Sequence, residues 1–173
     1  MLFKLVGGAL VIFSCTMIGF TVAGLYQQRP KILRNLQTAL SMLETEINYG
    51  CSPLPEALKS ISGRCEKEVA DLFLKTTKYL SAREGYTAGE AWEKALKDFS
   101  FNAGLRDGDI EILSAFGKYL GASDRDDQVR NIKLALESLR QQEMTAIEEK
   151  RKNERLWKYL GVLTGLMVFL LLY

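Results

Sequence analysis

The chain has 173 residues, a net charge of +2 at neutral pH and no histidine. The missing histidine excludes every catalytic pair and metal site that depends on an imidazole. The net charge is small and no basic stripe alternates with aromatic residues, so the sequence gives no sign of nucleic-acid binding. The length allows one compact domain of ordinary size, and the chain is most apolar at its two ends.

The first 28 residues contain a single charged side chain, Lys4. A helix from Leu5 to Tyr26 would be about 33 Å long, enough to cross the hydrocarbon core of a bilayer. The apolar run is long for a signal peptide and no A-x-A cleavage site follows it, although a cleaved signal is the competing interpretation. The pattern predicts an uncleaved transmembrane anchor over residues 1–28.

The segment 156–173 has an uncharged stretch from Leu160 to Leu172, with Trp157 and Tyr159 at its start. Such aromatics suit the headgroup level of a membrane, and a run without a polar face favours insertion over a helix lying on the surface. The segment therefore predicts a second transmembrane helix, with an interfacial helix as the alternative.

Basic side chains follow the first predicted span and precede the second. Arg29, Lys31 and Arg34 come after the first, and a cluster lies within 150–158 before the second. Positive charge marks the cytoplasmic side of a membrane protein. The sequence therefore predicts that residues 29–155 form a cytoplasmic domain and that both termini lie across the membrane. The second cluster also suits anionic lipid.

Between the predicted spans the apolar residues recur at steps of three and four, and no strand-like alternation is present. The expected inward faces are Ile32, Leu33, Leu36, Leu40, Leu43 and Ile47 in the first helix and Ala91, Trp92, Ala95, Leu96 and Phe99 in the fourth. The pattern predicts an all-α antiparallel bundle of about six helices. We expect helices over 30–49, from Ser52 through residue 58, over 65–82, 87–99 and 109–120, and from residue 123 onward.

Local signals set several of these helix ends. Ser52 is the expected N-cap of the second helix, ahead of Pro53 and Pro55. Thr87 and Glu90 have the spacing of a capping box. No breaker lies between Gln128 and Trp157, so the last helix is expected to run into the second span as one rod.

No group of residues predicts catalysis or metal binding. Glu44 and Glu46 are two apart on a helix and face different ways. The acidic residues of 124–127 lack the glycine and the distal glutamate of a calcium loop. No GK[ST] follows the glycines of 104–108, so no phosphate loop is expected. We expect a protein that is not an enzyme and binds no cofactor.

The three cysteines, Cys15, Cys51 and Cys65, are far apart and make no CxxC. An odd number without framework spacing argues against a disulfide scaffold and fits a reducing compartment.

Several sequence blocks resemble the stage III sporulation protein AB family from end to end. They are Arg29–Arg34, Leu36–Gly50, Pro53–Leu58, Ala91–Glu93, Glu111–Gly117 and Leu120–Gly121. The turn with Pro53-Leu54-x-Glu56-Ala57-Leu58 is also similar to one in the F-type inner-membrane platform proteins of type II secretion and type IV pilus systems.

This resemblance implies a scaffold in the channel-like complex between mother cell and forespore. The protein would lie in the mother-cell membrane that surrounds the forespore, with its domain in the cytoplasm. Its expected partners are a cytoplasmic sporulation ATPase, other membrane proteins of the channel, membrane lipids and copies of itself. The interaction residues we expect are Glu56, Arg64, Lys67 and Glu90. A membrane-anchored signalling protein is the alternative function.

Overall fold

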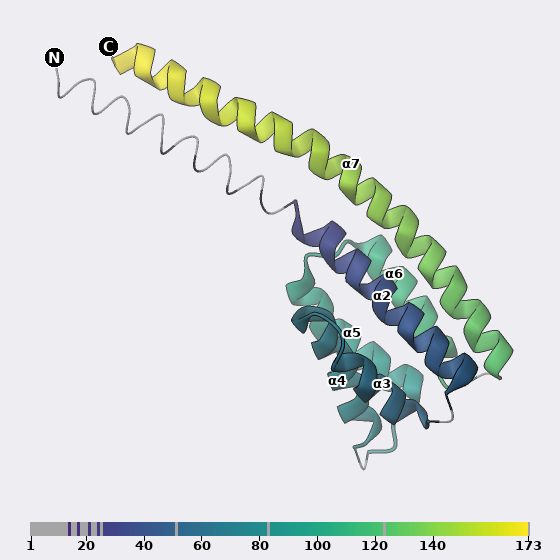
Figure 1. Ribbon diagram of the computed structural model, residues 1–173. Helices are drawn as coiled ribbons and strands as arrows, with labels where there is room; N and C mark the ends of the chain where they lie inside the picture. Colours follow the sequence, from purple (N-terminus) through teal and green to yellow (C-terminus); the bar gives the residue numbers. More distant parts are fainter. Residues whose placement is uncertain are drawn as a thin grey trace. The chain divides into compact units, whose positions relative to one another are not determined.

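The computed structural model describes residues 14, 17, 21, 24, 26–50, 52–82, 84–122 and 124–172, without the side chains of 102, 158, 161, 162, 165, 166 and 169–172. Every regular element in this part of the chain is an α-helix (Figure 1). The six helices are α2 (Gln28–Tyr49), α3 (Leu54–Ser62), α4 (Lys67–Leu80), α5 (Ala88–Ala103), α6 (Asp107–Tyr119) and α7 (Arg125–Leu172). The prediction of an all-α fold is confirmed.

The chain divides into two compact units, and α2 and α7 contribute to both. One unit is Lys31–Met144, which we call the helical unit, and the other combines Met1–Pro30 with Thr145–Tyr173. The predicted boundaries at residues 28 and 155 stay predictions.

The core of the helical unit is made by one apolar stripe on each helix. On α2 the predicted stripe is buried at Ile32, Leu33, Leu36, Leu40 and Leu43. On α5 all five residues of the predicted inner face, Ala91, Trp92, Ala95, Leu96 and Phe99, are buried. Complete burial of each large apolar side chain contributes about 1.5–3 kcal/mol. Patterning at helical spacing therefore determines which face of each helix points inward.

Trp92 lies at the centre of the α4, α5 and α6 packing. Its ring meets Phe73 of α4 and Phe116 of α6 edge to face, with centroid distances of 5.5 and 5.1 Å. The indole N–H donates a hydrogen bond of 2.8 Å to the carbonyl oxygen of Leu113. A buried indole without such an acceptor would destabilise the core, so this bond fixes how α5 and α6 meet.

Polar contacts show that α2 and α7 run antiparallel within the helical unit. Arg34 and Gln37 of α2 each donate a 2.8 Å hydrogen bond to Glu143 of α7. Glu44, further along α2, lies 3.7 Å from Lys133, earlier in α7. Residues further along α2 therefore pair with residues earlier in α7, as in an antiparallel pair. Figure 1 shows the two helices side by side.

Several predicted helix starts differ from the structure, including that of α2, which begins at Gln28 rather than residue 30. The N-cap of α3 is Pro53, not Ser52, because the Pro53 carbonyl accepts the N–H groups of Glu56 and Ala57. Helix α4 begins at Lys67 rather than residue 65. Helix α6 begins at Asp107 rather than Asp109, because the buried Asp109 carboxylate accepts the Arg106 N–H at 2.9 Å and so sits in the first turn.

Helix α5 confirms the predicted capping box but extends beyond the predicted end at Phe99. It continues to Ala103 and stops where Gly104 adopts a left-handed conformation, with φ of 61°. A glycine at this position ends a helix without steric cost, whereas nothing in residues 100–103 interrupts one.

Helix α7 is unbroken for 48 residues, which confirms that the last helix runs on through the predicted second span. The first predicted span, residues 1–28, lies mostly outside the described residues. Within the described part of the chain no helix has the length and apolar character that crossing a membrane requires. Neither predicted span is therefore confirmed.

Candidate interaction surface

The helical unit has two ends, which we distinguish by the elements that meet there. At the first, which we call the distal end, α3 and α5 begin and α6 stops. A Cβ added to Gly121, just after α6, would lie 2.9 Å from Ala88 Cβ and 3.3 Å from Leu54 Cδ2. The starts of α3 and α5 are therefore adjacent in space although they are far apart in sequence.

The opposite end, which we call the proximal end, is where α2 enters and α7 leaves the helical unit. There Lys31 of α2 makes a 2.5 Å ion pair with Glu66, the N-cap of α4. The hydrogen bond to Glu66 raises the pKa of Lys31, and the same bond lowers the pKa of Glu66. Gly108, in the first turn of α6, approaches Gln142 of α7. The starts of α4 and α6 therefore lie at this end.

The structure separates the four predicted interaction residues into two pairs. Glu56 and Glu90 are exposed in the first turns of α3 and α5, at the distal end. Arg64 and Lys67 are exposed beside Glu66, at the proximal end. The fold brings the helix starts that carry Glu56 and Glu90 together, but it does not place all four side chains on one surface.

Glu90 has a local structural function. Its carboxylate accepts hydrogen bonds of 2.9 Å from the backbone N–H and from the hydroxyl of Thr87, and the Thr87 hydroxyl accepts the Glu90 N–H. The bond from the backbone amide, aided by the hydroxyl, lowers the pKa of Glu90. Glu56 also lies in the first turn of its helix, but Pro53 caps that helix without a side-chain bond.

Beside Glu90, an aromatic pair holds a lysine on the outer face of α5. Tyr79 and Tyr86 meet edge to face, and Lys94 lies 3.8 Å from the Tyr86 ring centroid. Lys94 also donates a hydrogen bond to the Tyr86 hydroxyl, which raises the pKa of Lys94. Cation–aromatic contacts of this kind order a charged side chain at the surface. Sequence reasoning assigned no role to this group.

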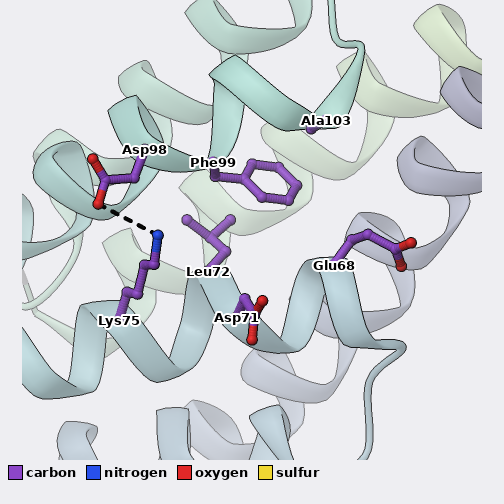
Figure 2. A pocket seen from close by; sticks show the side chains of 7 residues that line it. All are labelled: Glu68, Asp71, Leu72, Lys75, Asp98, Phe99 and Ala103. Carbon is purple, nitrogen blue, oxygen red and sulfur yellow. Dashed lines mark hydrogen bonds and ion pairs between the residues drawn. The ribbon is translucent and has the colours of Figure 1, made fainter.

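A pocket of about 110 Å³ lies between α4 and α5, toward the proximal end (Figure 2). Its floor is apolar, and three carboxylates and one lysine stand at its rim. The lining residues are Glu68, Asp71, Leu72, Lys75, Asp98, Phe99 and Ala103. Lys75 and Asp98 form a 3.4 Å ion pair across the pocket.

Glu68 and Asp71 were missed by the sequence reasoning. Both are exposed, and they are three residues apart on α4, so they share one face. That spacing was readable in the sequence. The apolar floor was not, because it depends on how Phe99 of α5 packs against Leu72 of α4.

A second hollow, of about 380 Å³, lies between α6 and α7 in the helical unit. Tyr119 and Leu134 line it and keep 50% and 60% of their surface exposed. Cys65, in the α3–α4 turn, is half-buried, and this burial raises the pKa of its thiol. Cys15 and Cys51 lie outside the described residues.

Comparison with known proteins gives consistent matches. The model of the family "Stage III sporulation protein AB" matches residues 4–173. A relative from Bacillus subtilis (strain 168), named stage III sporulation protein AB, is 38% identical over 169 residues, which cover 98% of either chain. A solved structure named Stage III sporulation protein AB (SpoIIIAB) is similar with a TM-score of 0.67 and 35% identity; the match covers 72% of this chain and 97% of that one.

Proposed function

The chain belongs to the stage III sporulation protein AB family, and on this premise we propose that it is a membrane platform that docks a cytoplasmic ATPase. In this role it is a non-catalytic scaffold of the channel-like complex between mother cell and forespore. It links the ATPase to the membrane components of that complex.

One observation carries the proposal beyond the family name. Helices α2 and α7 enter and leave the helical unit at the same end, where Lys31 meets Glu66 and Gly108 meets Gln142. Chain segments that leave a domain at one end suit two anchors in one membrane. This arrangement supports a protein that is held in the membrane by residues 1–28 and 156–173, with the helical unit on one side of that membrane.

The charges next to the two anchors indicate which side that is. Arg29, Lys31 and the basic stretch 150–155 flank the proposed spans on the side of the helical unit. By the positive-inside rule that side is the mother-cell cytoplasm. Both termini then lie across the mother-cell membrane that surrounds the forespore.

The distal end is the proposed docking surface for the ATPase. From Lys31 to Tyr49, α2 extends about 27 Å away from the proximal end at ~1.5 Å per residue. Glu56 and Glu90 lie at this distal end, beside the exposed Tyr49 and Tyr119 of neighbouring helix ends. Arg64 and Lys67, at the proximal end, suit anionic lipid or membrane partners instead.

Affinity purification from sporulating cells tests this function. The tagged full-length chain is extracted in mild detergent, and the proteins that accompany it are identified by mass spectrometry. We expect a sporulation ATPase together with membrane components of the channel. Glu56→Lys should reduce recovery of the ATPase, whereas the matched proximal variant Arg64→Glu/Lys67→Glu should retain it. Recovery of membrane components without any ATPase would leave a scaffold and remove the docking role.

A further inference from the structure

We propose that the pocket between α4 and α5 binds the basic stretch Lys150–Arg155 of a second copy of this chain, so that copies associate side by side in the membrane. The inference rests on the membrane anchoring in the proposed function. It adds a partner and a contact surface that docking of an ATPase does not require.

The size and lining of the pocket suit one long basic side chain. Its volume of about 110 Å³ is well below the ~300 Å³ at which small-molecule sites begin. The buried Leu72 and Phe99 offer an apolar floor for the methylene stem of a lysine or arginine. At the rim Glu68 and Asp71 offer two carboxylates for its charged head.

The charge at this rim is only partly neutralised within the described residues. Asp98 is paired with Lys75 at 3.4 Å, as Figure 2 shows. Glu68 contributes to the field that acts on Lys31, but Lys31 makes its ion pair with Glu66. Asp71 has no ion-pair or hydrogen-bond partner in the described part of the chain. The rim therefore favours an incoming cation.

The stretch 150–155 of α7 supplies suitable cations. Arg151, Lys152 and Arg155 are exposed, and their spacing of three and four residues places them on one face of the helix. Lys150 is half-buried beside them. Several side chains of one sign on one face complement an acidic pocket better than isolated surface lysines do.

Anchoring confines all copies of the chain to one bilayer, with their helical units on the same side. The pocket lies at the proximal end, and α7 leaves the helical unit at that end after Met144. Residue 150 follows six residues later, about 9 Å along a helix. Copies held in one bilayer share the same height, and confinement raises their effective concentration. A pocket on one copy and a stretch on the next make a head-to-tail contact, which generates a ring or a row.

Zero-length cross-linking of the full-length chain tests the contact directly. Chains labelled with ¹⁴N and with ¹⁵N are mixed in detergent, reconstituted together into vesicles and treated with a carbodiimide. We expect cross-linked peptides of mixed isotope that join Glu68 or Asp71 to Lys150 or Lys152. Because the contact is electrostatic, their yield should fall as salt is raised.

A charge swap distinguishes this contact from chance proximity. Glu68→Lys/Asp71→Lys removes the reacting carboxylates and reverses the charge of the rim, so these cross-links should be lost and the informative step is their restoration. Adding Lys150→Glu and Lys152→Glu to the same chain should restore cross-links between the exchanged positions. Glu93→Lys/Glu137→Lys, at exposed sites elsewhere, is the matched control and should leave the native yield unchanged. Far-UV circular dichroism checks that each variant keeps its helix content.

Cross-links confined to chains of one isotope, or a swap that restores nothing, would overturn the inference. Binding of the ATPase is measured on the same vesicles. Vesicles that bind the ATPase but give no mixed-isotope cross-links contradict the inference and leave the proposed function standing. Vesicles that do neither contradict both.

Discussion

At the scale of single residues, the contact between Gly117 and Trp92 determines how closely α5 and α6 approach. A Cβ at Gly117 would lie 2.3 Å from Trp92 Cδ1 and 3.0 Å from its Nε1. The indole cannot move away without lengthening its hydrogen bond to Leu113. We expect Gly117→Ala to lower the free energy of unfolding by about 2–4 kcal/mol, through overpacking and loss of that bond. Urea unfolding of the full chain in mild detergent, followed by circular dichroism, measures this.

Gly108→Ala is the matched control. Gly108 is also a helical glycine, but an added Cβ would meet only Gln142 Nε2, at 3.7 Å. Its alanine should be neutral or slightly stabilising, because alanine favours a helix more than glycine does. Equal effects of the two substitutions would contradict the importance of the Trp92 contact.

Glu90 gives a prediction about pH. Its pKa is lowered in the folded chain, so its contribution to stability is present above the ordinary carboxyl pKa and is lost as the pH falls through the folded value. Glutamine can still accept the Thr87 hydrogen bond but does not titrate. We expect the melting temperature of the native chain to fall more between about pH 6 and pH 3 than that of Glu90→Gln. Glu93→Gln, an exposed control on the same helix, should behave like the native chain.

At the scale of the elements, the antiparallel pair α2 and α7 depends on a buried charge. Arg29 is 8% exposed and makes a 3.2 Å ion pair with Glu149. Removal of Arg29 leaves the Glu149 carboxylate, which is only 30% exposed, without this cation. We expect Arg29→Ala to destabilise the chain by about 2–4 kcal/mol, and Arg29→Met/Glu149→Leu to be close to native.

Arg34→Ala serves as the comparison in the same thermal or urea unfolding measurement. The Arg34 side chain is 68% exposed; Glu143, at 12%, also accepts a 2.8 Å hydrogen bond from Gln37, which remains when Arg34 is removed. A pair with its cation in solvent contributes at most about 1 kcal/mol. If both arginines prove equally dispensable, burial of the Arg29 charge is unimportant to the pairing of α2 and α7.

The sequence predicted which segments are helical better than where each helix ends or which side chains meet between helices. The three–four spacing of Ile32 through Leu43 identified a buried face because burial imposes that period on any helix. The start of α6 was missed because an acidic residue such as Asp109 can occupy any of several positions in the first turn of a helix. Only the hydrogen bond that its carboxylate accepts from the Arg106 N–H shows which position it occupies. Contacts such as Gly117 with Trp92 depend on tertiary packing, which leaves no local pattern.

The candidate surfaces divide in the same way. Glu56 and Glu90 were expected as interaction residues, but their closeness depends on the packing of Gly121 against the starts of α3 and α5. The pocket beside Glu68 and Asp71 was missed because its floor comes from a second helix. Sequence patterns therefore located charged side chains but not the apolar surfaces on which they stand.

At the scale of the whole molecule, the proposed anchoring predicts how the chain leaves a membrane. The full chain should stay with the membrane after alkaline carbonate extraction. Deletion of either 1–27 or 156–173 alone should leave it attached, since one anchor remains. Deletion of both should release a soluble helical unit, detected by immunoblot of the supernatant. Release of the full chain by carbonate would contradict two spans.

The most direct test of the central claim is binding of a purified sporulation ATPase to the full chain in lipid nanodiscs. The account predicts that ATPase binds discs that carry the chain and not empty discs. It also predicts that Glu56→Lys, at the distal end, weakens this binding while Arg64→Glu/Lys67→Glu does not. Absence of binding to native discs, with the chain correctly folded and inserted, would contradict the platform role.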